Sequence, residues 1–201
     1  LGGAMALNLA GIDIDDVSVL DLYSCFPSAV QLGAQSLGLD ITPGSGRQWS
    51  QTGGLTFCGG PWNNYVMHAI ASVVKELRAN PGEYGLTWAN GGYATKHAFG
   101  IYSATPPTNG FRHDSPQADV DALPRRSLAS PTEASGKAVI EAYSVMFSRD
   151  GAPETALASC LLADGRRAWG TSSDPAIASA MCGGEWVGAS CHLEPDGALS
   201  V

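Results

Sequence analysis

Hydrophobic residues recur at intervals of three and four positions between residues 62 and 79, which is the spacing of a helix that buries one stripe. The stripe consists of Trp62, Tyr65, Val66, Ala69, Ile70, Val73, Val74 and Leu77. The sequence Asn-Pro-Gly at residues 80–82 ends the helix. The opposite face includes Met67 and His68 and has no charge before Lys75. The pattern therefore predicts a helix that is buried on both sides, with His68 packed in the core.

The rest of the first half alternates between helical and extended patterns. Helices are predicted over residues 1–10 and from Ser24 to Leu37, and strands over residues 17–22, 86–89 and 99–104. Ser24 with Pro27 has the form of a helix start, because a serine cap is followed by a proline in the first turn. Strands that alternate with helices indicate an α/β layer, which we assign to residues 1–112.

The hydrophobic pattern changes to a period of two in the second half. Five prolines fall between residues 106 and 131 among small and polar residues, which predicts an irregular connection over residues 113–135. Beyond it we expect strands over residues 138–147, 155–162 and 167–170, a short helix capped by Asp174, and a last strand from Trp186. Asp150-Gly151 and Asp164-Gly165 are typical of hairpin turns. Residues 136–201 are therefore predicted to form a small β-barrel or open β-sheet domain.

Composition excludes several classes of partner. The net charge is −8 and the basic pairs at residues 125–126 and 166–167 form no larger cluster, so nucleic acid is not expected as a partner. No apolar run approaches the ~18 residues of a membrane span. The five cysteines are odd in number, form no C-x-x-C pair and have no zinc-type spacing to histidine, which fits reduced thiols in a cytoplasmic protein without a metal site. The chain starts at Leu1 in a helical pattern without a signal segment, and we expect a piece of a longer protein.

Candidate chemistry gathers in the glycine-rich segment GGLTFCGGPWNN at residues 53–64, which leads into the long helix. The N-terminus of a helix presents unpaired amide donors and a partial positive charge, and both attract anions, thiolates and oxyanions. Glycines before such an end allow a ligand to come close to the backbone. Cys58 precedes the predicted helix end, so it is a candidate reactive thiol. The alternative is a small core residue.

Three segments resemble the C-terminal half of the thiolase superfamily. They are ALNLAGIDIDDVSVLDLYSCFPSAVQLG at residues 6–33, the glycine-rich segment at residues 53–64, and WANGGYATKHAFGIYS at residues 88–103. In detail they are similar to thiolase-like proteins of type 1, which are often called acetyl-CoA acetyltransferases and carry an additional C-terminal β domain. The resemblance implies half of a thiolase fold, a mixed sheet with a central buried helix, followed by a small OB-like β domain.

The chain departs from thiolases at the positions that carry their chemistry. Gly60 stands at the position of the histidine in the Gly-His-Pro loop, and Ala89 at the position of the second catalytic cysteine. Tyr23-Ser24-Cys25-Phe26 replaces the N-E-A-F or H-D-C-F loop. Loss of one general base commonly costs ~10²–10⁴ in rate, so ordinary thiolysis is not expected. The half of the fold that carries the thiolase nucleophile is also missing, so this chain alone is expected to be inactive.

Three side chains are candidate replacement groups for catalysis. His97 follows the turn at residues 90–92 and can act as an acid or base near neutral pH, or it packs under the loop. Tyr23 lies where the family has a polar site residue, and tyrosines transfer protons in some thiolase-like aldolases; the alternative is a core aromatic residue. Cys58 is the third candidate. The resemblance also implies thioester-binding residues at Gly59, Gly60, Pro61, Asn63, Asn90, Gly91 and Gly92. Asn63 and Asn64 are more simply helix caps, and the turn at residues 90–92 a left-handed turn.

The leading hypothesis is a thiolase-like protein of lipid metabolism, similar to acyltransferases, that handles acyl-CoA. Its ligand is a coenzyme A thioester, and no covalently bound cofactor is expected. Two alternatives stay open: a non-catalytic acyl-CoA-binding or scaffold module, and a thiolase-like retro-aldolase that uses Tyr23. The exposed face of half a thiolase is expected to meet the N-terminal half or a second copy, because large apolar patches rarely stay open.

Overall fold

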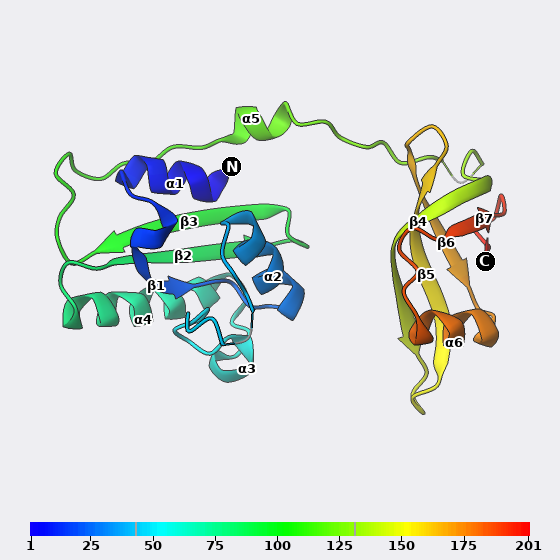
Figure 1. Ribbon diagram of the computed structural model, residues 1–201, viewed down its shortest axis with the longest axis horizontal. Helices are drawn as coiled ribbons and strands as arrows, with labels where there is room; N and C mark the ends of the chain where they lie inside the picture. Colours follow the sequence, from blue (N-terminus) through cyan, green and yellow to red (C-terminus); the bar gives the residue numbers. More distant parts are fainter. Residues whose placement is uncertain (43, 131) are drawn as a thin grey trace. The chain divides into compact units, whose positions relative to one another are not determined.

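The computed structural model describes residues 1–42, 44–130 and 132–201, so Pro131 of the proline-rich stretch lies outside the described residues. The chain divides into two compact units, Leu1–Leu123 and Pro124–Val201 (Figure 1). Each unit has its own buried core, and the two are described separately.

The N-terminal unit is built on a three-stranded sheet of β1 (Val17–Asp21), β2 (Tyr84–Gly91) and β3 (Lys96–Ser103), in that order. β1 and β2 run parallel, and β2 and β3 form an antiparallel hairpin. The strands lie where the sequence predicts them, with β2 and β3 longer than expected. Because β1 and β2 are parallel, the loops that follow them leave the sheet at the same end.

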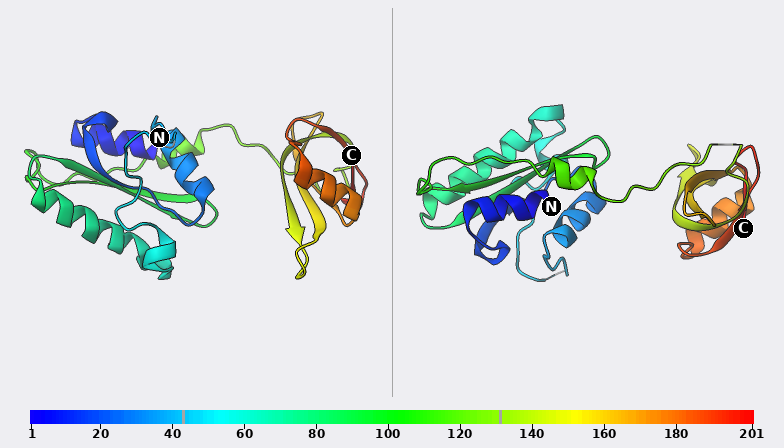
Figure 2. Two further views of the ribbon diagram at one scale, coloured as in Figure 1. Left: turned by 60° about the horizontal axis from the view of Figure 1, so that its bottom comes forward. Right: turned by 90° about the horizontal axis from the view of Figure 1, so that it is seen from above.

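Helices cover both faces of this sheet (Figure 2). α1 (Gly2–Ala10) and α2 (Pro27–Ser36) lie on one face, and α4 (Tyr65–Ala79) lies on the other. On the first face, Leu7 of α1 and Ala34 of α2 pack with Leu20 and Trp88 of the sheet. On the second face, Val73 and Leu77 of α4 pack on Val19. The predicted α/β layer is confirmed.

Within this chain α4 is covered on one side only, which corrects the prediction of burial on both sides. Tyr65, Ala69, Val73 and Leu77 face the sheet and are buried. Met67 on the opposite face is 54% exposed. His68 is half-buried rather than a core residue. The described part of the N-terminal unit has a single sheet, and that sheet covers only the inner side of α4.

α4 packs closely against β2 at Gly85. A Cβ atom on Gly85 would lie 2.5 Å from Val73 Cγ1 and 3.1 Å from Leu77 Cδ1. We expect Gly85→Val to lower the free energy of unfolding of this unit by about 2 kcal/mol, because overpacking a close contact forces the helix off the sheet. Urea denaturation followed by peptide-resolved hydrogen exchange measures the change. Gly60→Ala is the control, since its Cβ would meet only Leu55 Cδ2 at 3.9 Å, and an equal loss in both variants would contradict the packing argument.

The C-terminal unit is a small curled β domain with one helix. Its strands are β4 (Gly136–Phe147), β5 (Pro153–Leu162), β6 (Arg167–Ser172), β7 (Ser190–Leu193) and β8 (Leu199–Ser200). They are ordered β6-β5-β4-β7-β8, and a parallel bridge between Thr171 and Ala198 brings β8 back to β6. The strands accordingly form a ring in the right-hand view of Figure 2. With α6 (Pro175–Gly183) between β6 and β7, this is the small OB-like barrel that the family resemblance implies.

Local sequence signals explain most of this unit. The Asp174 carboxylate accepts a hydrogen bond from the Ala176 amide at 2.8 Å, which is the predicted cap of α6. Gly151 and Gly165 both have a positive φ angle in the predicted hairpin turns. The prediction of a last strand from Trp186 is wrong, because residues 186–189 form a turn and β7 begins at Ser190. The indole of Trp186 instead donates to the Ala180 carbonyl of α6 at 3.1 Å.

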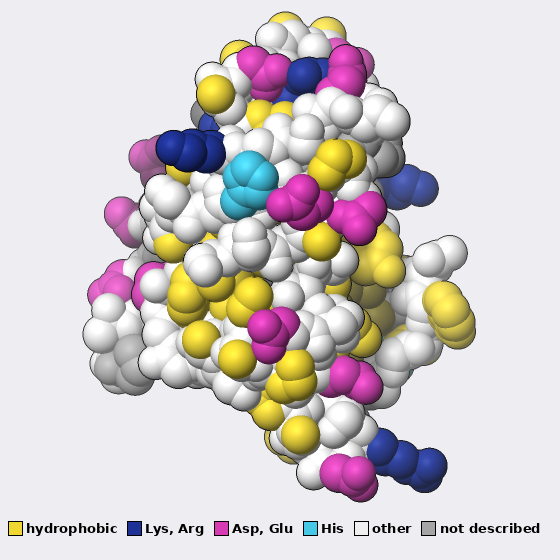
Figure 3. All heavy atoms as spheres, turned by 90° about the vertical axis from the view of Figure 1, so that its right-hand side faces the viewer, with side chains coloured by type: hydrophobic (Ala, Val, Ile, Leu, Met, Phe, Trp, Pro, Cys, Tyr) yellow, Lys and Arg dark blue, Asp and Glu magenta, His cyan; other side chains and the backbone are white. Residues whose placement is uncertain are grey.

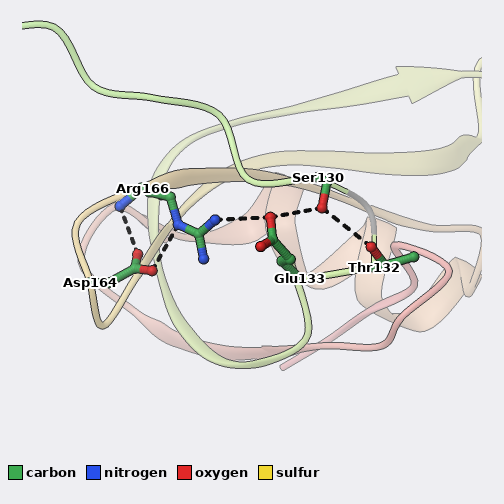
Figure 4. Close-up of polar contacts among 5 residues, drawn as sticks. All are labelled: Ser130, Thr132, Glu133, Asp164 and Arg166. Carbon is green, nitrogen blue, oxygen red and sulfur yellow. Dashed lines mark hydrogen bonds and ion pairs between the residues drawn. The ribbon is translucent and has the colours of Figure 1, made fainter.

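The proline-rich connection contains more structure than the sequence suggests. α5 (Gln117–Asp121) forms one short helix, and residues 127–129 pair with β6 through Arg167. Polar and charged side chains hold this bridged segment, since Arg166 bonds Asp164 and Glu133, and Glu133 also accepts from Ser130 (Figure 4). The segment covers the outer edge of β6, which otherwise presents unpaired backbone groups.

Candidate functional site

Three loops meet at the end of the first sheet where β1 and β2 end. We call this surface the loop face: residues 22–26 after β1, residues 50–64 before α4, and residues 90–95 between β2 and β3. The Asn90 amide donates to Cys25 Sγ at 3.7 Å, and Ser24 Oγ lies 3.3 Å from the Tyr65 hydroxyl. The structure therefore brings together the three segments that the sequence singles out.

Asp21, the last residue of β1, lies beneath the loop face and binds residues 50–52 of its second loop. It is fully buried, and its Oδ2 accepts hydrogen bonds from Ser50 Oγ at 2.9 Å and from the amides of Gln51 at 2.8 Å and Thr52 at 3.3 Å. Its Oδ1 is buried without a partner among the described residues. Burial raises the pKa of the Asp21 carboxyl group, and these hydrogen bonds oppose the rise only in part.

Beyond Thr52 the chain turns sharply through glycines. Gly53 and Gly54 have φ angles of 75° and 92°, and a Cβ atom on Gly54 would lie 2.7 Å from Ser24 Oγ. Glycine is required at residue 54 on both grounds. The turn opens the single-turn helix α3 (Leu55–Cys58), where Cys58 Sγ contacts the Thr52 carbonyl at 3.4 Å.

Cys58 does not lie at the N-terminus of the long helix, which corrects the reason for selecting it. Residues 59–61 and the 3-10 turn η2 (Trp62–Asn64) separate α3 from α4. Gly59, Gly60 and Asn63 are exposed and Pro61 is half-buried. Asn64 flanks α4 without a capping side-chain bond, so the asparagine cap suggested by the sequence is absent. These residues line the open side of the loop face, and their binding role stays a prediction.

The turn between β2 and β3 is strained. Gly92, Tyr93 and Ala94 have successive φ angles of 54°, 56° and 58°, which are unfavourable for the two non-glycine residues. Tyr93 is completely exposed at its tip. Gly91 lies at the end of β2, and its carbonyl accepts from the Thr95 amide at 3.2 Å. Such strain persists only where the surroundings hold it, and His97 is part of that support.

Both nitrogens of His97 are engaged. The Trp88 indole, which can only donate, bonds Nδ1 at 3.1 Å. Nε2 therefore carries the proton and donates to the Ala94 carbonyl at 2.9 Å. The imidazole also stacks on Trp88 with ring centroids 5.7 Å apart. His97 thus braces the strained turn, and proton transfer by this residue requires one of the two bonds to break.

Tyr23 lies inside the loop face and retains its phenolic proton. Its ring packs edge-on against Tyr65, with centroids 4.9 Å apart. Burial raises the pKa of the Tyr23 hydroxyl, and the neighbouring Cys25 and Tyr65 raise it further. The group is therefore suited to donate a proton or a hydrogen bond and is a poor base near neutral pH.

Sequence reasoning missed the polar residues beneath the loops. Asp21, Ser24, Thr52 and Tyr65 form one hydrogen-bonded chain, whereas the sequence indicated only a helix start at Ser24 and a core position at Tyr65. α2 in fact begins at Pro27 after Phe26, and Ser24 turns its hydroxyl toward Tyr65 instead of capping the helix. The available signal was the carboxylate of Asp21 at the end of an otherwise apolar strand.

A hollow lies at the opposite end of the sheet, where β1 and β2 begin. Its volume is about 570 Å³, and Ser18, Arg47, Glu76 and Glu83 are among its lining residues. None of the site residues predicted from the sequence lines it. Within the described residues no group of three or more His, Cys, Asp or Glu side chains is placed to hold a metal ion. A search of the same residues finds no helix with the length and apolar character to cross a membrane.

Comparison with known proteins identifies the family. Residues 116–198 match the model of the thiolase-like protein type 1 additional C-terminal domain. Among solved structures, the chain is similar to a monomeric SCP2-thiolase-like protein type 1 from Mycobacterium smegmatis, with 36% sequence identity and a TM-score of 0.84. That match covers 99% of this chain and 44% of the other, so the chain spans less than half of its neighbour's length. A search of curated proteins finds no match. The chain belongs to the thiolase-like proteins of type 1, as a thiolase-like α/β unit followed by the additional C-terminal domain of that family.

Proposed function

We propose that this chain supplies the acyl and pantetheine side of an acyl-CoA-binding site at the loop face. The observation that carries the proposal is the close approach of the three loops: Asn90 bonds Cys25, and a Cβ atom on Gly54 would lie 2.7 Å from Ser24 Oγ. These segments resemble the loops that bind a thioester in thiolases. Their joint placement on this chain favours the same class of ligand over an unrelated one.

The surface chemistry of the loop face suits an apolar, thioester-bearing ligand. Large apolar side chains stand exposed around it: Phe26 at 66%, Phe57 at 80%, Trp62 at 90% and Tyr93 at 102%. Isolated exposed side chains are ordinary, but four on the loops of one sheet end indicate a binding surface. Phosphates fit this chain less well because its net charge is −8. On the face shown in Figure 3, the Lys and Arg side chains lie scattered. We therefore assign the CoA phosphates to contacts outside this chain.

Ordinary thiolysis is not part of the proposal. Gly60 and Ala89 offer no group that exchanges a proton, and His97 is held by Trp88 and Ala94. This engagement of His97 favours binding without thiolysis as the second candidate function. Tyr23 keeps its proton, so a retro-aldolase role for it would be as an acid or hydrogen-bond donor.

Trp62→Ala is expected to weaken binding of an acyl thioester by about tenfold. Trp62 projects from the loop face and supports no buried core, so its loss removes apolar contact area with little effect on folding. Calorimetry with the octanoyl thioester of N-acetylcysteamine, which lacks the CoA phosphates, measures the affinity. Trp169→Ala is the matched control, because Trp169 is 61% exposed on β6 of the other unit. Absence of binding to the unmodified chain, or equal losses in both variants, would refute the proposed site.

A further inference from the structure

We propose that Ser24, Tyr65, Thr52 and Asp21 form a proton relay that serves the α-carbon of a thioester bound at the loop face. The relay gives this chain an activity of its own, the exchange of the α-proton, without the nucleophile of a complete thiolase. The inference rests on the proposed function, because it needs a thioester at this surface.

The four residues form a continuous chain of hydroxyl groups that ends at a carboxylate. Ser24 Oγ lies 3.3 Å from the Tyr65 hydroxyl, which lies 2.7 Å from Thr52 Oγ1. Thr52 Oγ1 donates to Asp21 Oδ2 at 3.4 Å. When Thr52 Oγ1 donates its one proton to Asp21, the Tyr65 hydroxyl is left to donate to Thr52 and the Ser24 hydroxyl to Tyr65. This polarity leaves lone pairs of the Ser24 oxygen free for a proton from outside.

The burial of Asp21 is the feature that a purely structural role does not explain. Asp21 has 0% exposure, and no ion pair joins it to a described basic residue. An unpaired buried carboxylate is costly, and a neutral acceptor would hold the Gln51 and Thr52 amides at lower cost. Some buried carboxylates have a perturbed pKa and a hydrogen-bonded path to the surface. Such carboxylates are found most often at functional sites. The path from Asp21 ends at Ser24, on the loop face.

Ser24 is also held at the centre of the loop face by close packing. The hypothetical Cβ of Gly54 falls 2.7 Å from Ser24 Oγ, so the glycine turn lies directly against this hydroxyl. Ser24 is half-buried, whereas Tyr65 is only 1% exposed and cannot touch a ligand. Ser24 is therefore the catalytic residue of the relay. Tyr65, Thr52 and Asp21 act through it.

The step balances without any further reactant. The α-carbon–hydrogen bond of the thioester breaks, its electron pair moves into the enolate, and the proton passes to Ser24 Oγ. At the same time the Ser24 proton moves to Tyr65, the Tyr65 proton to Thr52, and the Thr52 proton to Asp21. The products are the enolate and a protonated Asp21. The reverse transfer in deuterated water, after Asp21 exchanges with solvent, places deuterium on the α-carbon.

The test is deuterium uptake at the α-carbon of the octanoyl thioester of N-acetylcysteamine, followed by proton NMR with the 201-residue chain. We expect uptake above the protein-free rate, and a loss of about 10²-fold in Ser24→Ala, Tyr65→Phe and Thr52→Val, in keeping with removal of a general base. Thr52→Ser retains the hydroxyl and should remain within about threefold of the unmodified chain. Tyr102→Phe, a tyrosine on β3 outside the relay, is the matched control.

Three outcomes separate the relay from the proposed function. Binding with uptake that falls in Tyr65→Phe and Thr52→Val and recovers in Thr52→Ser supports the relay. Binding without uptake, or uptake unchanged in Tyr65→Phe, overturns the relay and leaves the binding function standing. Absence of binding overturns both.

The acid limb of the pH profile of deuterium uptake adds a readout that a structural role would not move, since uptake should fall as Asp21 becomes protonated. The titratable groups near Asp21 to be considered are Tyr65, Tyr23, Cys25 and Cys58.

Discussion

Asp21→Ala is expected to lower the free energy of unfolding of the N-terminal unit by about 3 kcal/mol at neutral pH. The substitution removes the acceptor of the Ser50 hydroxyl and of the Gln51 and Thr52 amides. A buried donor left without a partner costs about 1–3 kcal/mol, and relief of the buried charge offsets part of the sum. Urea denaturation with hydrogen exchange read on peptides of residues 1–123 measures the loss.

Asp21→Asn distinguishes the contribution of the hydrogen-bond acceptor to stability from that of the negative charge. It keeps an amide oxygen for the same donors, so we expect a change within about 1 kcal/mol. Because burial raises the folded pKa of Asp21 above its unfolded value, its contribution to stability is complete below the unfolded pKa and is lost as pH rises through the folded pKa. The unmodified chain should therefore lose stability relative to Asp21→Asn as pH rises through that window. A gain instead, or an Asp21→Ala loss under 1 kcal/mol, would contradict this account.

The elements that sequence predicted well are those with local causes. The stripe from Tyr65 to Leu77 produces α4, because the 3.6-residue period places these side chains on one face. The Asp-Gly turns at residues 150–151 and 164–165 fix the β4–β5 and β5–β6 hairpins. The OB-like domain followed from the family resemblance, since a period of two does not distinguish one small barrel from another. The parallel bridge at Thr171, which closes the barrel, joins residues with no local signal.

The sequence predicts where the candidate site lies but not which side chains contact one another within it. Asp21 contacts residues 29 to 31 positions later, and Asn90 contacts a thiol 65 positions earlier. No periodicity or turn signal encodes such pairs. Tyr65 was placed correctly in the buried stripe, yet its hydroxyl could not be connected to Thr52 and Ser24 before the fold was known. His97 shows the opposite case, since its residue type suggested acid–base chemistry and its partners assign it to the turn.

In the C-terminal unit, Cys182 should react about three orders of magnitude faster than Cys160. Cys160 is fully buried, and burial beside Cys191 raises its pKa from the ordinary 9.0 to about 12. Since the thiolate is the reactive form, that rise lowers its fraction at pH 8 roughly thousandfold. Cys182 on α6 is exposed to solvent. We expect iodoacetamide to modify Cys182 within minutes and to leave Cys160 unmodified, as followed by peptide mass spectrometry.

Unfolding provides the control for this prediction. In concentrated urea, where the barrel core is lost, all five cysteines should react at similar rates, and Cys182→Ser should remove the fast phase from the folded protein. The sulfurs of Cys160 and Cys191 lie 3.6 Å apart, well beyond the ~2.05 Å of a disulfide bond, so both count as free thiols in this titration. Modification of Cys160 at the rate of Cys182 would show that the barrel opens readily. A protected Cys160 would instead establish that the additional C-terminal domain has a closed core of its own.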